Sequence, residues 1–223
     1  MTVIFAQDIS CEKQDRILFE QINLHLNAGE LMLLRGENGA GKTSLLRILV
    51  GLSRPQSGQV HINGYDAHTD TNQASQQLIY FGHKLGVSAL LNPIENLSFW
   101  CQQHQLTVSQ EQIIKVLEEL GLEGLESLPV KNLSAGQQRR VSLARLWLSK
   151  YAKNHADAGV HSANHANLWV LDEPMTALDV NMVANFEAHI ASFLKGGGCV
   201  LMTSHQTVNI DHPSKEFELE YRW

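Results

Sequence analysis

Several short apolar stretches near the start of the chain have the length and alternation of β-strands. The pattern predicts strands over residues 4–9, 17–26, 31–34 and 59–62. Residues 31–34 (LMLL) are apolar without a break, which is typical of a strand buried on both faces of a parallel sheet. Asn63-Gly64 is a dipeptide of tight hairpin turns, so the strand over 59–62 is expected to turn back there.

Apolar residues at helical spacing begin after the third of these strands. The apolar side chains within 45–50 share one face, which predicts a helix from about residue 41 to 50, and Gly51 suits its end. A second helix is predicted over 180–194. It lies between two continuous apolar runs, 168–171 and 199–203, that indicate further buried strands.

Two capping boxes mark helix starts in the middle of the chain, where residues 94–121 are predicted to be helical. Ser109 and Gln112 form the first box. Ser134 and Gln137 form the second, which opens a helix rich in basic and apolar residues.

Two later segments have patterns of their own. Residues 217–223 alternate apolar and charged side chains, which predicts a half-exposed edge strand. Residues 150–167 are rich in Ala, Asn and His without an apolar period and indicate a surface insertion. Its histidines have no cysteine or paired carboxylate beside them, so a solvated loop is favoured over a metal site at His155, His161 and His165.

Composition and charge narrow the class of protein. With 223 residues and 43% hydrophobic content the chain can bury a sizeable core, so disorder is not expected. A net charge of -6 and a pI near 6.0 argue against nucleic acid as a partner. Cys11, Cys101 and Cys199 lack paired spacing and suit reduced thiols in a cytosolic compartment. No export signal and no run of about 20 apolar residues is visible, so we expect a chain that reaches a membrane only through a partner.

Residues 36–43, GENGAGKT, match the phosphate-loop pattern at every required position, after a predicted buried strand and before a predicted helix. The glycines permit a tight backbone turn that aims N–H groups at phosphates, and the helix dipole favours the anion. Lys42 is predicted to reach the β- and γ-phosphates of ATP, and the Thr43 hydroxyl to ligate Mg²⁺. The predicted nucleotide contacts are Gly36, Glu37, Asn38, Gly39, Ala40, Gly41, Lys42, Thr43 and Ser44.

The apolar run 168–171 ends in two carboxylates, Asp172 and Glu173. Asp172 is placed to hold Mg²⁺ through its water shell, and Glu173 can act as general base on the attacking water. Together with the phosphate loop, this strand predicts a nucleotide hydrolase of the phosphate-loop class.

The segment 133–137, LSAGQ, resembles the LSGGQ signature of ATP-binding cassettes (ABC proteins), with Ala135 in place of the first glycine. A capping box alone would explain Ser134 and Gln137 equally well. The order of motifs favours the family: phosphate loop, signature, Asp-Glu strand, residues 177–179 (ALD), and His205 after a strand.

This resemblance covers nearly the whole chain and implies an α/β fold, the P-loop NTPase fold of ABC ATPases. The expected single domain over 1–223 has a RecA-like core with an antiparallel β subdomain, residues 1–82 and 150–223. An α-helical subdomain that carries the signature is expected to be inserted at about 83–149.

In this family two cassettes meet head to tail, so the resemblance implies a homodimer in which the signature of one subunit caps ATP held by the other. Asp179 would then lie in the loop that couples the two sites, and His205 would contact the γ-phosphate and orient Glu173. Lys42, Glu173 and His205 are thus the expected catalytic residues. The expected signature contacts to nucleotide are Ser134, Ala135, Gly136 and Gln137.

The chain departs from the family pattern at two places. The loop before the Glu95-Asn96 pair carries His83 where cassettes usually have a glutamine; the resemblance implies that His83 belongs to the nucleotide site, since an imidazole can still ligate metal or hold water. The family usually offers an aromatic side chain near residue 13 for adenine stacking, whereas this chain has Lys13 and Arg16. The adenine base would then stack on Arg16 or be bound only weakly.

Within the family, the chain resembles in particular the ATP-binding subunits of the bacterial cytochrome c maturation system, described as heme exporters. The segments that carry this likeness are 27–31, 81–86, 133–148 and 168–174. It implies a peripheral protein on the cytoplasmic face of the bacterial inner membrane, bound to integral membrane subunits of the maturation complex. ATP hydrolysis would release the heme-loaded periplasmic chaperone, and docking would use residues 83–100, where Phe99 and Trp100 are either groove contacts or core aromatics.

Two alternatives stay open. A cassette that transports another small molecule would carry the same catalytic motifs, because these describe the ATPase and not its cargo. A soluble cassette ATPase acting on DNA or ribosomes is less consistent with the chain, which has neither a long coiled coil nor a second cassette.

Overall fold

The computed structural model describes residues 1–151 and 167–220. The chain forms two compact units: Met1–Gly82, Ala166–Pro174 and Glu187–Trp223 make the first, and His83–His165 with Met175–Phe186 make the second. Helix α6 (Val180–Lys195) contributes to both. The histidines of the predicted insertion lie outside the described residues.

The first unit contains an antiparallel sheet of order β2-β1-β4-β5. Its strands are β1 (Thr2–Lys13), β2 (Arg16–Asn27), β4 (Ser57–Ile62) and β5 (Tyr65–Asp66). Asn63 and Gly64 both have positive φ, 49° and 87°, and join β4 to β5 as the hairpin dipeptide predicts.

A parallel sheet of order β6-β7-β8-β3-β9 forms the rest of the β-structure of this unit. The strands are β6 (Leu78–Phe81), β7 (Leu168–Leu171), β8 (Cys199–Thr203), β3 (Leu31–Arg35) and β9 (Ser214–Glu218). β7 and β8 are buried along their whole length, which explains why both are continuous apolar runs. β3 lies between β8 and β9, and because the strands are parallel the carboxyl ends of β7, β8 and β3 lie at the same end of the sheet.

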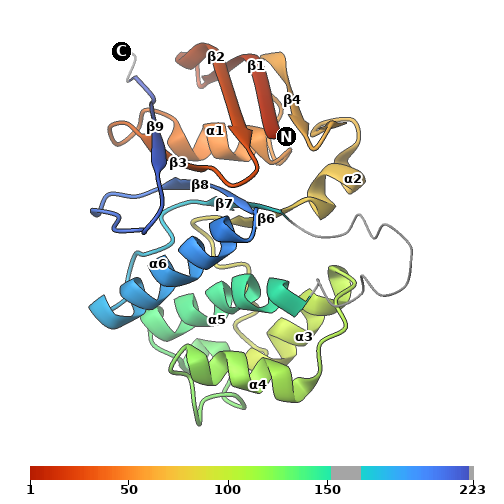
Figure 1. Cartoon of the computed structure of the whole chain (residues 1–223), viewed down its shortest axis with the longest axis vertical. Helices are drawn as coiled ribbons and strands as arrows, with labels where there is room; N and C mark the ends of the chain where they lie inside the picture. The colour runs from red at the N-terminus through yellow and green to blue at the C-terminus, as the bar shows by residue number, and fades with distance from the viewer. Residues whose placement is uncertain (152–166, 221–223) are drawn as a thin grey trace. The chain divides into compact units, whose positions relative to one another are not determined.

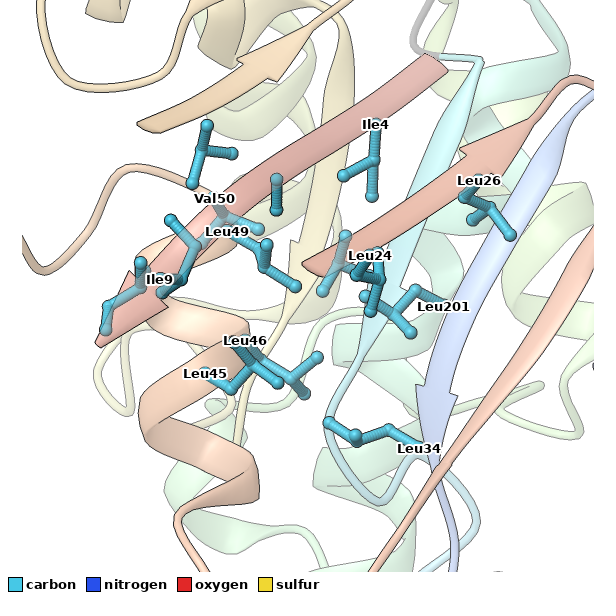
Figure 2. Close-up of a cluster of buried hydrophobic side chains, with 14 of the residues drawn as sticks. Ile4, Ile9, Leu24, Leu26, Leu34, Leu45, Leu46, Leu49, Val50 and Leu201 are labelled. Atoms are coloured by element: carbon cyan, nitrogen blue, oxygen red, sulfur yellow. The ribbon is translucent and has the colours of Figure 1, made fainter. Parts of the chain in front are cut away.

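Helix α1 (Lys42–Leu49) lies between the two sheets (Figure 1). Its buried leucines pack against Ile4, Leu24 and Leu26 of the antiparallel sheet and against Leu34 and Leu201 of the parallel sheet (Figure 2). Burial of these leucines on both sides holds the helix in place, whereas residues 36–39 of the predicted phosphate loop, which precedes it, stay exposed or half-exposed.

The second unit is helical and contains α3 (Pro93–Gln103), α4 (Gln110–Glu119), a 3₁₀ turn at Val130–Asn132 and α5 (Ala135–Leu148). Both predicted capping boxes are present, at Ser109–Gln112 and at Ser134–Gln137. The Trp147 ring stacks on Phe186 of α6, with ring centroids 5.8 Å apart.

Three predictions of secondary structure were wrong or incomplete. The edge strand covers Ser214–Glu218, so it begins three residues before the predicted start and ends directly before the buried Leu219, while 221–223 lie outside the described residues. The stretch 94–121 is two helices interrupted at 104–109. β5, the short helix α2 (Thr71–Gln76) and β6 were not predicted, although the apolar run 78–81 (LIYF) has the length of a buried strand.

Within residues 1–151 and 167–220, no helix combines the length and the apolar character that crossing a bilayer requires.

Candidate functional site

The loop between β3 and α1 has the backbone that its glycines predict. Gly36, Gly39 and Gly41 have φ of 137°, 83° and 101°, where side chains with a Cβ are strained. A Cβ on Gly36 would also lie 2.5 Å from the carbonyl oxygen of Leu219. One on Gly41 would lie 3.2 Å from the Phe19 ring. All three glycines are therefore favoured by their backbone conformation, and Gly36 and Gly41 also by the close approach of Leu219 and Phe19.

The Lys42 ammonium group lies over this loop. Its Nζ donates to the carbonyl oxygens of Gly36 at 2.6 Å and Glu37 at 3.0 Å. An ammonium group has three donors, so one hydrogen remains for an oxygen of a ligand at the start of α1. The helix dipole adds partial positive charge at the same place.

A chain of hydroxyl and carboxylate groups joins α1 to the ends of β7 and β8. Thr43 Oγ1 donates to Asp172 Oδ2 at 2.8 Å, and Thr203 Oγ1 donates to Asp172 Oδ1 at 2.9 Å. Asp172 N also donates to Phe81 O at 2.7 Å. Asp172 is only 3% exposed, and these bonds satisfy a carboxylate that would otherwise be costly to bury.

Glu173 follows at once but faces a different partner. Its φ is 50°, so the backbone turns sharply where β7 ends, and its N–H donates to Thr203 Oγ1 at 2.8 Å. Glu173 Oε1 lies 2.9 Å from His205 Nε2. Lys42, Thr43, Asp172, Glu173 and His205 thus all belong to the first unit.

Surrounding side chains fix this edge of the sheet. Arg35, at the end of β3, donates to the carbonyl oxygen of Ser204 at 3.2 Å, directly before His205. Burial raises the pKa of Tyr80 to about 12, and the negative charge of Asp172 acts in the same direction.

The donor set at Thr43 and Asp172 fits Mg²⁺. A hydroxyl and a carboxylate are hard oxygen ligands, and Mg²⁺ typically takes one or two carboxylates and completes its shell with water and phosphate oxygens. Thr43 is exposed and Asp172 buried, so the pair has a solvent-facing side.

The signature residues lie in the second unit, at the start of α5. Ser134 Oγ accepts from Gln137 N at 3.3 Å, and Gln137 Oε1 accepts from Ser134 N at 2.8 Å. A Cβ on Gly136 would lie 2.8 Å from the carbonyl oxygen of Ala177, so the signature lies directly against residues 177–179. Ala135 is the first residue of the helix.

Asp179 accepts from Met182 N at 2.9 Å and so satisfies a free N–H in the first turn of α6. His83 also belongs to the second unit and is exposed. The loop that follows it is anchored by α5, because the carbonyl oxygen of Leu85 accepts from Ser142 Oγ and from the guanidinium of Arg145.

Lys13 and Arg16 face each other where the β1–β2 hairpin turns. The structure places Lys13 at the first turn of α1, directly after the phosphate loop, since its Nζ donates to Ser44 Oγ at 3.0 Å. The sequence analysis named Lys13 only as a departure from an aromatic residue and did not connect it with Ser44.

Thr203 was missed altogether as a site residue. Its hydroxyl is fully buried and bridges Asp172 and Glu173. The available signal was a lone threonine closing an apolar strand (CVLMT) two residues before His205.

Fold and site together define a cassette-type phosphate-loop ATPase, and solved structures share this fold. One described as the ATP binding subunit of an ABC transporter superimposes with a TM-score of 0.77 at 22% identity, covering 91% of this chain and 79% of that one. The dimeric post-hydrolysis state of the ATP-binding cassette MJ0796 bound to ADP and Pi gives a TM-score of 0.79 at 19% identity, covering 99% and 97%.

Sequence comparison gives the family. Residues 19–154 match the ABC transporter family. The chain is 41% identical over 210 residues to the cytochrome c biogenesis ATP-binding export protein CcmA of Escherichia coli K12, covering 94% of this chain and 92% of that protein. The protein of the same name from Shigella sonnei is 40% identical over the same shares. This chain therefore belongs to the ABC transporter family.

Proposed function

We propose that this chain is the ATP-hydrolysing subunit of a membrane ABC complex in cytochrome c biogenesis. The observation that carries the proposal is its 41% identity, over 94% of the chain, to an export protein of that process in E. coli. The connected groups from Thr43 to His205 supply the chemistry that such a subunit needs.

Nucleotide binding rests on the start of α1. The N–H groups of residues 37–43 and Lys42 Nζ would bind the β- and γ-phosphates of ATP, with Ser44 in the same turn. Thr43 and Asp172 would hold Mg²⁺, which neutralises phosphate charge when bound.

Hydrolysis rests on Glu173. Its carboxylate would accept a proton from the water that attacks the γ-phosphate, as a general base. His205 Nε2, 2.9 Å from Glu173 Oε1, holds that carboxylate in one orientation and would donate to the γ-phosphate. Thr203 Oγ1 accepts from Glu173 N and so fixes the backbone from which the base projects.

A head-to-tail homodimer would complete the site. Ser134 and Gly136 sit at the N-terminus of α5, where partial positive charge favours a phosphate of ATP held by the other subunit. The contact between Gly136 and Ala177 ties this signature to the loop containing Asp179, so both would respond together to nucleotide. His83 would take the place of the glutamine usual in this loop.

Integral membrane subunits of the maturation complex would bind the second unit at the bacterial inner membrane, on its cytoplasmic face. Leu90 and Phe99 are 74% and 57% exposed, which favours contact residues over core packing for Phe99. Buried Asn96 shapes the loop before α3 through bonds to the backbone of Ser88, Leu91 and Asn92. Opening and closing of the homodimer with ATP hydrolysis would be passed to these membrane subunits and would release a heme-loaded chaperone on the periplasmic side.

Two variants test the proposal in a strain that lacks the native subunit. Lys42→Ala should abolish ATP binding and turnover, whereas Glu173→Gln should bind MgATP and fail to hydrolyse it. Both should abolish holocytochrome c. Glu218→Gln, which removes an exposed carboxylate at the end of β9, is the matched control and should complement fully.

The outcomes separate the two parts of the proposal. Normal holocytochrome c with Glu173→Gln, alongside lost hydrolysis, would remove the maturation role and leave the ATPase. Recovery of ribosomes or DNA, instead of integral membrane proteins, in a pull-down from detergent-solubilised membranes would favour a soluble cassette ATPase.

A further inference from the structure

The first turn of α1 presents three side chains in three directions. Successive residues of an α-helix are rotated by about 100°. Lys42 turns to the loop carbonyls, Thr43 to Asp172, and Ser44 to the ammonium group of Lys13. Two ammonium groups, from distant parts of the sequence, therefore lie beside one helix N-terminus.

The fold holds Lys13 there rigidly. β1 ends at Lys13, and Gln14 and Asp15, with φ of 51° and 59°, form the tight turn into β2. β2 then packs on the loop itself, because a Cβ on Gly41 would meet the Phe19 ring. The tip of the hairpin is thus fixed against the phosphate loop by its own packing.

The charge of Lys13 is not neutralised by a neighbour. Among residues 1–151 and 167–220, no carboxylate forms an ion pair with Lys13, and its bond to Ser44 goes to a neutral hydroxyl. Glu12, its neighbour in β1, accepts instead from Gln56. An exposed ammonium held beside a helix N-terminus by a neutral partner is available to a second, anionic ligand.

We propose that Lys13 is a second phosphate-binding cation, positioned by Ser44, so that the hairpin tip recognises the phosphates of the nucleotide and not its base. This inference rests on the proposed nucleotide site. It predicts that Lys13 contributes equally to the affinity for every nucleoside triphosphate, because its ammonium group would contact the phosphate charge that all of them share.

The test is isothermal titration of the full chain with MgATP, MgGTP and inorganic tripolyphosphate with Mg²⁺. Lys13→Met should raise Kd by about fivefold to tenfold, as expected for loss of one exposed charge-assisted bond, and by the same factor for all three ligands. Lys13→Arg should stay within about twofold of the native chain. The factor should shrink at high ionic strength because the contact is exposed.

Lys195→Met is the matched control, since Lys195 is also an exposed lysine of the first unit with one polar partner, Asp211. It should leave every Kd unchanged. A double-mutant cycle of Lys13→Met with Ser44→Ala should be non-additive if Ser44 positions the ammonium group. Lys13→Gln replaces Lys13→Met if the latter unfolds early in a thermal melt.

The inference is overturned if Lys13→Met weakens ATP alone and leaves tripolyphosphate unchanged, which would place the contact on the base. An unchanged Kd for all three ligands overturns it as well. Failure of the native chain to bind MgATP is a different result, because it would remove the proposed function itself.

Discussion

Thr203→Val tests whether the site depends on the hydroxyl that joins its two carboxylate residues. Valine keeps the shape of threonine but offers neither a donor nor an acceptor. The Thr203 side chain is 0% exposed, donates to Asp172 Oδ1 at 2.9 Å and accepts from Glu173 N at 2.8 Å. The substitution leaves both of these groups without their partner where solvent has little access.

The expected loss follows from those two bonds. Each buried group that loses its partner costs about 1–3 kcal/mol, so the loss of two partners should lower the free energy of unfolding by roughly 2–6 kcal/mol. Glu173 also holds a left-handed backbone that costs on the order of 1 kcal/mol and that this bond helps to maintain. A displaced general base should lower turnover roughly tenfold to a hundredfold, with Kd for MgATP nearly unchanged.

Urea unfolding, phosphate release at saturating MgATP and calorimetric Kd measure the three quantities. Thr203→Ser retains the hydroxyl and should keep most of the turnover, while losing about 1 kcal/mol of packing. A Thr203→Val protein with native stability and native turnover would refute the reasoning, since neither bond could then hold Glu173 in place.

Three further predictions concern the rest of the molecule. Gly36→Ala places a Cβ 2.5 Å from a backbone carbonyl oxygen and should raise the calorimetric Kd for MgATP at least about tenfold. Gly124→Ala, at another glycine of positive φ (78°) but with no heavy atom within 4 Å of the added Cβ, should not. Burial lowers the pKa of Arg145 to about 10. Arg145→Met removes the guanidinium bonds to the carbonyl oxygens of Leu85 and Ser142 and should cost roughly 1–3 kcal/mol in urea unfolding, partly restored by Arg145→Lys. Burial alone would raise the pKa of Glu30, but its bonds to Lys215 and the adjacent turn lower it from 4.5 to about 2. A lowered pKa means that ionised Glu30 stabilises the fold fully above pH 4.5, by on the order of 1 kcal/mol after solvent screening. In acid unfolding curves this contribution should be lost as the pH falls from 4.5 to 2. Glu30→Gln should lack it at every pH.

Local signals in the sequence were sufficient for the parts of the protein that depend on local chemistry. The phosphate loop needs particular residues at fixed spacing on either side of a strand and a helix, and the structure has β3, the loop and α1 in that order. The capping boxes at Ser109 and Ser134 are likewise bonds over three residues, so spacing alone predicts them. Asp172 and Glu173 could be recognised because charged residues seldom end a buried strand without a function.

The tertiary structure decided every contact that depends on which strands are neighbours. Thr203 meets Asp172 because β8 lies beside β7, and Lys13 meets Ser44 because the hairpin tip packs against α1, although neither pair is close in sequence. The same holds for Leu219, directly after β9, which is buried in the core and whose carbonyl oxygen lies close to Gly36 of the phosphate loop. A one-dimensional pattern records the polarity of each position but not its partner. Burial and hydrogen bonding between distant segments can be known only once the chain has folded.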